Sequence, residues 1–146
     1  MVRRLDDILK IEWSRILLLM IGVSGILFIY LFQDLSFITA FSDDLPSANF
    51  LFALRKFVRL FLNDIFMLMI ISAWFRNASI TRLALGVQLV DLFILFPVYL
   101  FIKLKWEGDS EISSPLLSQL HRLIINPTLM ILLIPAVYFQ KISGRK

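Results

Sequence analysis

Long apolar stretches, interrupted at intervals by short polar ones, make up most of this chain. Four of them lie at about residues 16–32, 58–75, 83–102 and 123–139. A helix rises about 1.5 Å per residue, so about 20 apolar residues cross a hydrocarbon core of about 30 Å. The pattern predicts an all-α membrane protein with four transmembrane helices.

Composition favours a membrane protein over a water-soluble one. Apolar residues make up 59% of the 146 residues, and the mean hydropathy is +0.83. A soluble chain of this length has too much surface relative to its volume to bury so many apolar side chains. We therefore expect residues 1–146 to form a single integral membrane domain.

The first stretch has the length of a secretory signal peptide, but its flanks favour a span that is not cleaved. The region before it carries three acidic residues, Asp6, Asp7 and Glu12, and no small-x-small cleavage site follows it.

The second stretch is preceded by a helix start that is polar. Ser47 is expected to cap a helix that begins near Ala48, runs through the membrane interface and leads into the second span.

Prolines and short polar segments divide the rest of the chain. Pro97 and Pro135 lie within the third and fourth stretches and predict kinks, because neighbouring groups in a span can satisfy the carbonyls that a proline frees. A short connection is expected at residues 76–82, and a longer polar loop at residues 103–119.

Basic residues near the ends of the spans predict the orientation in the membrane. Nine lie on the side of the two termini: Arg3, Arg4, Lys10, Arg15, Arg76, Arg82, Lys141, Arg145 and Lys146. The other six are Arg55, Lys56, Arg59, Lys103, Lys105 and Arg122, and the acidic residues of that side are Asp34, Asp43, Asp44, Glu107, Asp109 and Glu111. We expect a multi-pass protein of the inner membrane with both termini in the cytoplasm.

Charge and residue usage exclude several classes of function. The net charge is +4, but the basic residues lie at the ends of apolar stretches, where they contact lipid headgroups, so no nucleic-acid partner is expected. The chain has no Cys and a single His, His121. A thiolate metal site, a cysteine nucleophile and a multi-histidine metal site are therefore excluded within one chain, and we expect no cofactor and no metal.

Polar residues inside the second stretch are the first candidates for a functional site, because charge in hydrocarbon is costly. Arg55, Arg59 and Asn63 are spaced by four and share one helical stripe, and Asp64 follows directly. One interpretation is that Arg55 and the adjacent lysine reach the headgroups while Asp64 pairs with Arg59. The other is that the stripe faces a second membrane protein or a polar ligand.

Asp91 lies near the middle of the third stretch. Protonated, or bonded to Asn63, Gln88 or Arg59, it would hold helices together. Charged and beside a water path, it would be a proton or cation site.

His121, Arg122 and Asn126 lie at the start of the fourth stretch. Interface anchoring and helix capping explain these residues more simply than catalysis, because no nucleophile of a known type accompanies them. Trp13, Trp74, Trp106 and Tyr138 lie at span edges, as an aromatic belt does. Gly22 and Gly25 would allow a neighbouring helix to approach the first span closely. No enzymatic activity is predicted.

Two segments carry a resemblance to a known family. The first is Arg-Lys-x-x-Arg-x-x-Leu-Asn at 55–63, followed by a span that ends in Trp-Phe-Arg at 74–76. The second is the tail at 121–141, with a basic residue, Pro, a Leu-rich run, Pro-Ala, two aromatic residues and Gln-Lys. Over about residues 55–141 the chain resembles the small membrane proteins associated with exosortase F in the Bacteroidetes.

The resemblance implies an accessory role beside an exosortase, a polytopic membrane enzyme thought to process proteins with a C-terminal sorting signal. Exosortases are thought to use Cys, Arg and His, and this chain has no Cys. We therefore expect a non-catalytic partner that packs against the sorting enzyme or its substrates, surrounded by membrane lipids. The alternative is a small oligomeric transporter or channel that uses Asp91 as a proton or cation site.

Overall fold

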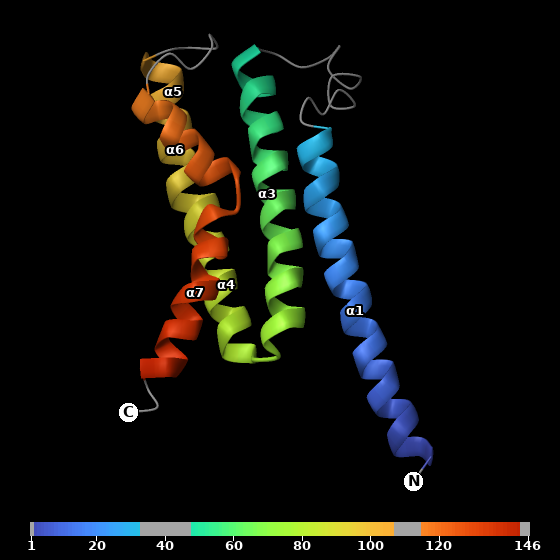
Figure 1. Cartoon of the computed structure of the whole chain (residues 1–146). Coiled ribbons are helices and arrows are strands. Elements are labelled where there is room, and N and C mark those ends of the chain that lie inside the picture. The colour runs from blue at the N-terminus through green and yellow to red at the C-terminus, as the bar shows by residue number, and fades with distance from the viewer. Residues whose placement is uncertain (1, 33–47, 107–114, 144–146) are drawn as a thin grey trace.

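The chain folds into long helices that run side by side (Figure 1). The computed structural model describes residues 2–32, 48–106 and 115–143, and within these ranges it contains no strand. In chain order the elements are α1 (Val2–Leu31), α3 (Ala48–Phe75), α4 (Ala78–Val90), the π-helical η1 (Asp91–Leu95), α5 (Phe96–Trp106), α6 (Pro115–Ile125) and α7 (Thr128–Ser143). The predicted all-helical class is confirmed.

Among the described residues, three helical segments are long and apolar enough to cross a membrane, namely Glu12–Leu31, Asn49–Phe75 and Ala78–Lys105. A fourth candidate is the pair Pro115–Ile125 and Thr128–Gln140, whose two helices are bent by 67°. Successive segments alternate in direction. The start of α1 and the end of α7 therefore lie at the same end of the bundle (Figure 1).

The fourth predicted span, residues 123–139, is wrong as a single helix. The structure has a turn at Asn126 and Pro127, with α6 before it and α7 after it. Proline disfavours helical backbone in the residue before it and lacks the N–H that a continuous helix would need. The Thr128 N–H donates to the Asn126 carbonyl across 2.6 Å and closes the turn.

Pro97 produces a wider turn of helix. The segment Asp91–Leu95 just before it is π-helical, and the Phe96 N–H donates to the Asp91 carbonyl. Such local adjustments satisfy carbonyls that a proline frees inside a span. Asp91, the polar residue in the middle of this span, therefore begins the irregular segment.

The connection between α3 and α4 is shorter than the predicted 76–82, because only Arg76 and Asn77 separate the two helices. Arg76 has a φ of 54°, in the left-handed region that reverses the chain after a helix. The Asn77 side chain caps α4 by accepting from the Ser79 N–H across 2.8 Å. The predicted loops that contain residues 33–47 and 107–114, with Ser47 and the acidic residues they carry, lie outside the described residues.

Two clusters of buried apolar side chains lie along α3. One, nearer its N-terminus, joins α3 to α5 and α6 and is made of Leu60, Phe96, Tyr99, Leu117, Ile124 and Ile125. The other, nearer its C-terminus, joins α3 to α4 and α7 and is made of Met67, Ile71, Ile80, Ala84, Met130 and Val137. Helix α3 is thus the central element on which the others pack.

Helix α1 approaches α3 through its glycines. A Cβ atom at Gly22 would lie 2.9 Å from the Phe66 carbonyl oxygen, and one at Gly25 would lie 2.5 Å from the Phe66 ring. Both positions therefore require the absence of a side chain, as the sequence suggested. Ile29, further along α1, is also buried.

Candidate functional site

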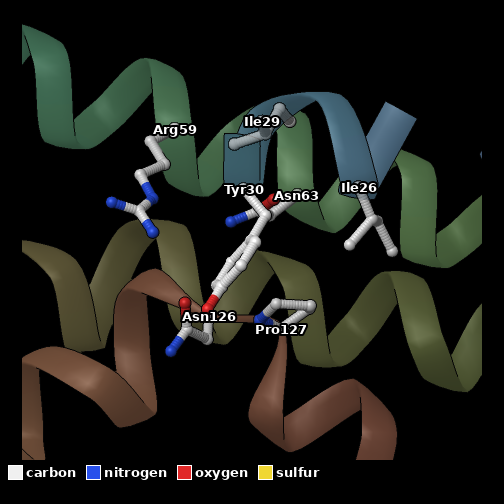
Figure 2. Close-up of a pocket in the computed structure, with 7 residues that line it drawn as sticks. All are labelled: Ile26, Ile29, Tyr30, Arg59, Asn63, Asn126 and Pro127. Atoms are coloured by element: carbon white, nitrogen blue, oxygen red, sulfur yellow. The ribbon is translucent and has the colours of Figure 1, made fainter. Parts of the chain in front are cut away.

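A polar cavity lies where α1, α3 and the turn between α6 and α7 meet. Its volume is about 430 Å³, and it is lined by Tyr30, Arg59, His121, Arg122, Ile125 and Asn126. A smaller hollow of about 50 Å³ shares Tyr30, Arg59 and Asn126 and adds Ile26, Ile29, Asn63 and Pro127 (Figure 2). In Figure 2 the Tyr30 side chain extends from α1 toward Asn126 at the turn. We call the two together the Arg59 cavity.

Helix α3 provides the first wall of the cavity. Arg55, Arg59 and Asn63 follow one another by single turns on this helix, as the spacing predicted. The Nε atoms of Arg55 and Arg59 are buried and have no hydrogen-bond partner within the described residues. The predicted pair between Arg59 and Asp64 is not formed, since Asp64 Oδ2 is also buried without a partner. Arg59 and Asp64 are five residues apart, which is about 140° around a helix, so their side chains point in different directions.

Asn63 attaches the turn between α6 and α7 to α3. Its Nδ2 donates to the Ile125 carbonyl across 3.0 Å, in a buried bond. Ile125 is the last residue of α6, and the carbonyl groups in the last turn of a helix have no N–H donor within the helix itself. The Asn63 amide therefore satisfies a carbonyl that would otherwise be unpaired where the chain turns. A bond between Asn63 and Asp91, one of the alternatives that the sequence offered, is not formed, and the Asn63 amide bonds the backbone of α6 instead.

Helix α6 provides the second wall and brings in a histidine. His121 Nδ1 and the Tyr99 hydroxyl lie 2.7 Å apart and share a hydrogen bond. When Nδ1 accepts from the hydroxyl, the ring carries its hydrogen on Nε2, which is then a donor for the cavity. Arg122 is the next residue of α6 and exposes its side chain to the cavity.

Positive charge is concentrated at this end of the bundle. Lys56, Arg59, Lys103 and Arg122 all lie close enough to His121 for their charges to act on it. The Nζ atoms of Lys56 and Lys103 lie 5.5 and 5.9 Å from the centroid of the Phe52 ring. Lys103 comes from α5 and is fully buried. Three helices therefore direct basic side chains toward one region.

A separate pair of acidic residues lies deeper in the bundle. Asp64 on α3 and Asp91 on η1 are each only 1% exposed, and they are close enough for their charges to interact. Asp64 Oδ2 and Asp91 Oδ1 have no hydrogen-bond partner within the described residues. Asp91 therefore does not join helices through bonds to Asn63, Gln88 or Arg59, as one interpretation of the sequence required.

The opposite end of the bundle is held by surface contacts. Trp74 Nε1 donates to the Tyr138 hydroxyl across 3.1 Å, which joins α3 to α7. An exposed ion pair between Arg76 and Glu12 joins the turn after α3 to α1. Trp13 and Trp74 are mostly exposed, in line with an aromatic belt, whereas the Trp106 side chain lies outside the described part of the structure.

The structure brings four predicted site residues together at the Arg59 cavity: Arg59, Asn63, Arg122 and Asn126. Arg55 lies one turn from Arg59, and Asp64 and Asp91 form the separate acidic pair. Sequence reasoning did not assign Tyr30, Tyr99 or Lys103 to the site. Tyr30 and Tyr99 cannot be recognised as site residues from a sequence so rich in aromatic residues. Lys103 directly follows an apolar stretch, and such a position favours contact with lipid headgroups. Its full burial is a tertiary property, and its Nζ lies over the Phe52 ring of α3.

Within the residues that the structure describes, no group of three His, Cys, Asp or Glu side chains is placed to hold a metal ion. Comparison of the chain with protein-family models, with curated proteins and with solved structures finds no match.

Proposed function

We propose that this chain is a non-catalytic accessory protein of the inner membrane. It packs against a membrane-embedded sorting enzyme of the exosortase type, or against that enzyme's substrates, and the Arg59 cavity is its contact site. The proposal combines the resemblance described above with the geometry of the cavity. Both termini are placed in the cytoplasm, which agrees with α1 beginning and α7 ending at the same end of the bundle (Figure 1).

One observation carries the proposal. The two segments that bear the resemblance, residues 55–63 and 121–141, are far apart in the sequence but form facing walls of the same cavity. The bond from Asn63 to the Ile125 carbonyl joins them directly. Polar and charged groups within a membrane bundle are costly, and by default they mark a functional contact.

The test is co-purification with the enzyme. The chain is co-expressed with a candidate exosortase, and a tag on one protein is used to purify both in mild detergent. We expect a stable complex that Arg59→Ala and Asn126→Ala weaken. Arg82→Ala is the matched control, because Arg82 is exposed on α4, outside the cavity. Complex formation and sorting that survive both cavity substitutions would show that the contact assignment is wrong.

A small oligomeric transporter or channel is the second candidate, and the acidic pair favours it. Two buried carboxyl groups with unpartnered oxygen atoms, one of them on a π-helical segment, are an arrangement that proton-coupled membrane proteins use. The test is substrate-dependent proton flux in vesicles that contain the purified chain. Asp91→Asn should abolish the flux while Glu12→Gln, on the exposed ion pair, leaves it intact. A flux that Asp91→Asn does not change would remove this candidate, whereas a chain that purifies alone as a homo-oligomer would favour it.

A further inference from the structure

The Arg59 cavity collects more positive charge than the described residues neutralise. Arg59 and Arg122 line it, and Lys56 lies close by, near enough for its charge to act on His121. Within the described residues, no acidic side chain forms an ion pair with Arg55, Arg59 or Arg122. A group of cations beside the hydrocarbon is unfavourable unless an anion accompanies it.

The donors of the cavity suit a tetrahedral anion with several oxygen atoms. Two guanidinium groups approach from different helices, and each can bind an oxyanion with two parallel N–H bonds. Tyr30, Asn126 and His121 add neutral polar groups on the remaining sides. Two guanidinium groups carry more positive charge than one carboxylate can neutralise. A phosphate has more oxygen atoms and more negative charge than a carboxylate, so it suits these donors better.

The depth of Arg59 fits the level of a lipid phosphate. Arg59 precedes Trp74, at the other end of α3, by fifteen residues, which is about 22 Å of helix. With Trp74 at one boundary of a hydrocarbon core of about 30 Å, the Arg59 Cα lies inside the opposite boundary and its long side chain reaches that boundary. The cavity is therefore placed where the phosphate of a membrane amphiphile lies.

The surroundings of the cavity also suit an amphiphile. The smaller hollow beside it adds apolar lining from Ile26 and Ile29 of α1 and from Pro127 (Figure 2). The neighbouring α1 side chains Leu27, Phe28 and Leu31 are more than half exposed, as expected of a helix face that contacts acyl chains. A headgroup in the polar cavity can thus have its chain lie along α1.

We propose that the Arg59 cavity binds the phosphate group of an anionic amphiphile, with Arg59 and Arg122 as its principal ligands. The inference shares its cavity with the proposed function and gives the class of ligand that occupies it. It does not depend on the sorting enzyme, because binding is measured on the purified chain alone. Loss of co-purification and loss of phosphate binding are therefore separate results.

The experiment is a titration of the full chain in nanodiscs of phosphatidylcholine with phosphatidic acid, followed by native mass spectrometry. We expect saturable binding of one anionic lipid per chain. Arg59→Gln and Arg122→Gln should each weaken it at least tenfold, and Arg59→Lys should weaken it less than Arg59→Gln. The matched control is Lys105→Gln, because Lys105 is an exposed cation of α5 that does not line the cavity. Circular dichroism confirms that each variant is folded.

A competition arm identifies the source of the phosphate. Displacement of the lipid by inorganic phosphate at millimolar concentration would support a site for the phosphate group itself, free or esterified. Retention of the lipid under the same conditions would support a site that also needs the acyl chains.

Two results would overturn the proposal. One is binding that does not saturate and does not exceed the binding of neutral lipid. The other is an equal loss in Arg59→Gln and Lys105→Gln, which would show that the basic residues attract anionic lipid only as a general surface charge.

Discussion

Asn63 in the middle of α3 donates a hydrogen bond to the carbonyl of Ile125, the last residue of α6, across 3.0 Å. The two residues are 62 positions apart in the sequence. The bond places the turn between α6 and α7 against α3, and the cavity between these elements and α1 exists because of that placement. A single side-chain amide thus links the break in the fourth apolar segment to the basic stripe of the second.

Replacing Asn63 by Leu should destabilise the chain by about 1 kcal/mol, because hydrogen bonds between membrane helices contribute about that much. The Ile125 carbonyl would lose its partner in a buried setting. The free energy of unfolding is measured by titration with a denaturing detergent. Asn49→Leu is the control, since Asn49 is exposed at the start of the same helix. Equal stabilities of the two variants would show that the bond contributes nothing.

Gly22→Ala should destabilise the packing of α1 on α3 by about 1–3 kcal/mol, the range for overpacking of a tight interface. Its Cβ would lie 2.9 Å from a backbone oxygen, which cannot move as a side chain can. Gly86→Ala is the control, because a Cβ at Gly86 meets nothing within 4 Å. On α4 that substitution should leave stability unchanged or raise it by up to about 1 kcal/mol, because Ala favours helix. Thermal unfolding in nanodiscs compares the two, and a Gly22→Ala protein as stable as the Gly86→Ala protein would contradict the close approach.

Pro127→Leu should allow α6 and α7 to join into a straighter helix, because it restores the missing N–H and releases Asn126 from its restriction. The chain has no Cys, so spin labels attach only to introduced ones, here at the exposed positions Gln119 and Phe139. Twenty residues of straight helix would separate them by about 30 Å. We expect a shorter distance in the labelled parent chain, because of the 67° bend, and a longer one in the variant.

Pro135→Leu is the control for that experiment. Pro135 lies inside α7, which stays helical on both sides of it, so its replacement should change the distance between the labels much less than Pro127→Leu does. An unchanged distance in Pro127→Leu as well would mean that tertiary contacts, such as the Asn63 bond, maintain the bend without the proline.

Arg76→Gly should be more stable than Arg76→Ala by up to about 1 kcal/mol, because Arg76 has a φ of 54° and only glycine adopts this region without a steric cost. Both variants lose the ion pair with Glu12, so the difference between them reports the backbone alone. Glu12→Gln removes the same pair and should cost less than about 1 kcal/mol, because both side chains are 51% exposed. Denaturation curves of the three variants give the order, and an Ala variant more stable than the Gly variant would contradict the left-handed turn.

Local chemistry made several features predictable. The apolar stretches predicted the helices, because the membrane requires backbone groups to be satisfied within each segment. The spacing of Arg55, Arg59 and Asn63 placed them on one face, and Gly22 and Gly25 indicated a close helix approach. The partners of these residues could not be predicted. Asp64 was as good a candidate partner for Arg59 as any, and the structure instead leaves both without an ion pair and directs Asn63 to a backbone carbonyl.

The sequence alone determined that the chain is helical and apolar, that Pro97 disturbs regular helix, and that basic and acidic residues enter the spans. These properties depend on neighbours along the chain. Only the tertiary structure decided that the fourth apolar stretch bends by 67° at Asn126 and Pro127 and that Arg59, Arg122 and His121 line one cavity. It also decided that the buried Asp64 and Asp91 come close enough for their charges to interact, apart from the residues that line that cavity. The physical reason is that helices in lipid associate through close packing and scattered polar contacts between distant segments, which spacing along one helix does not specify.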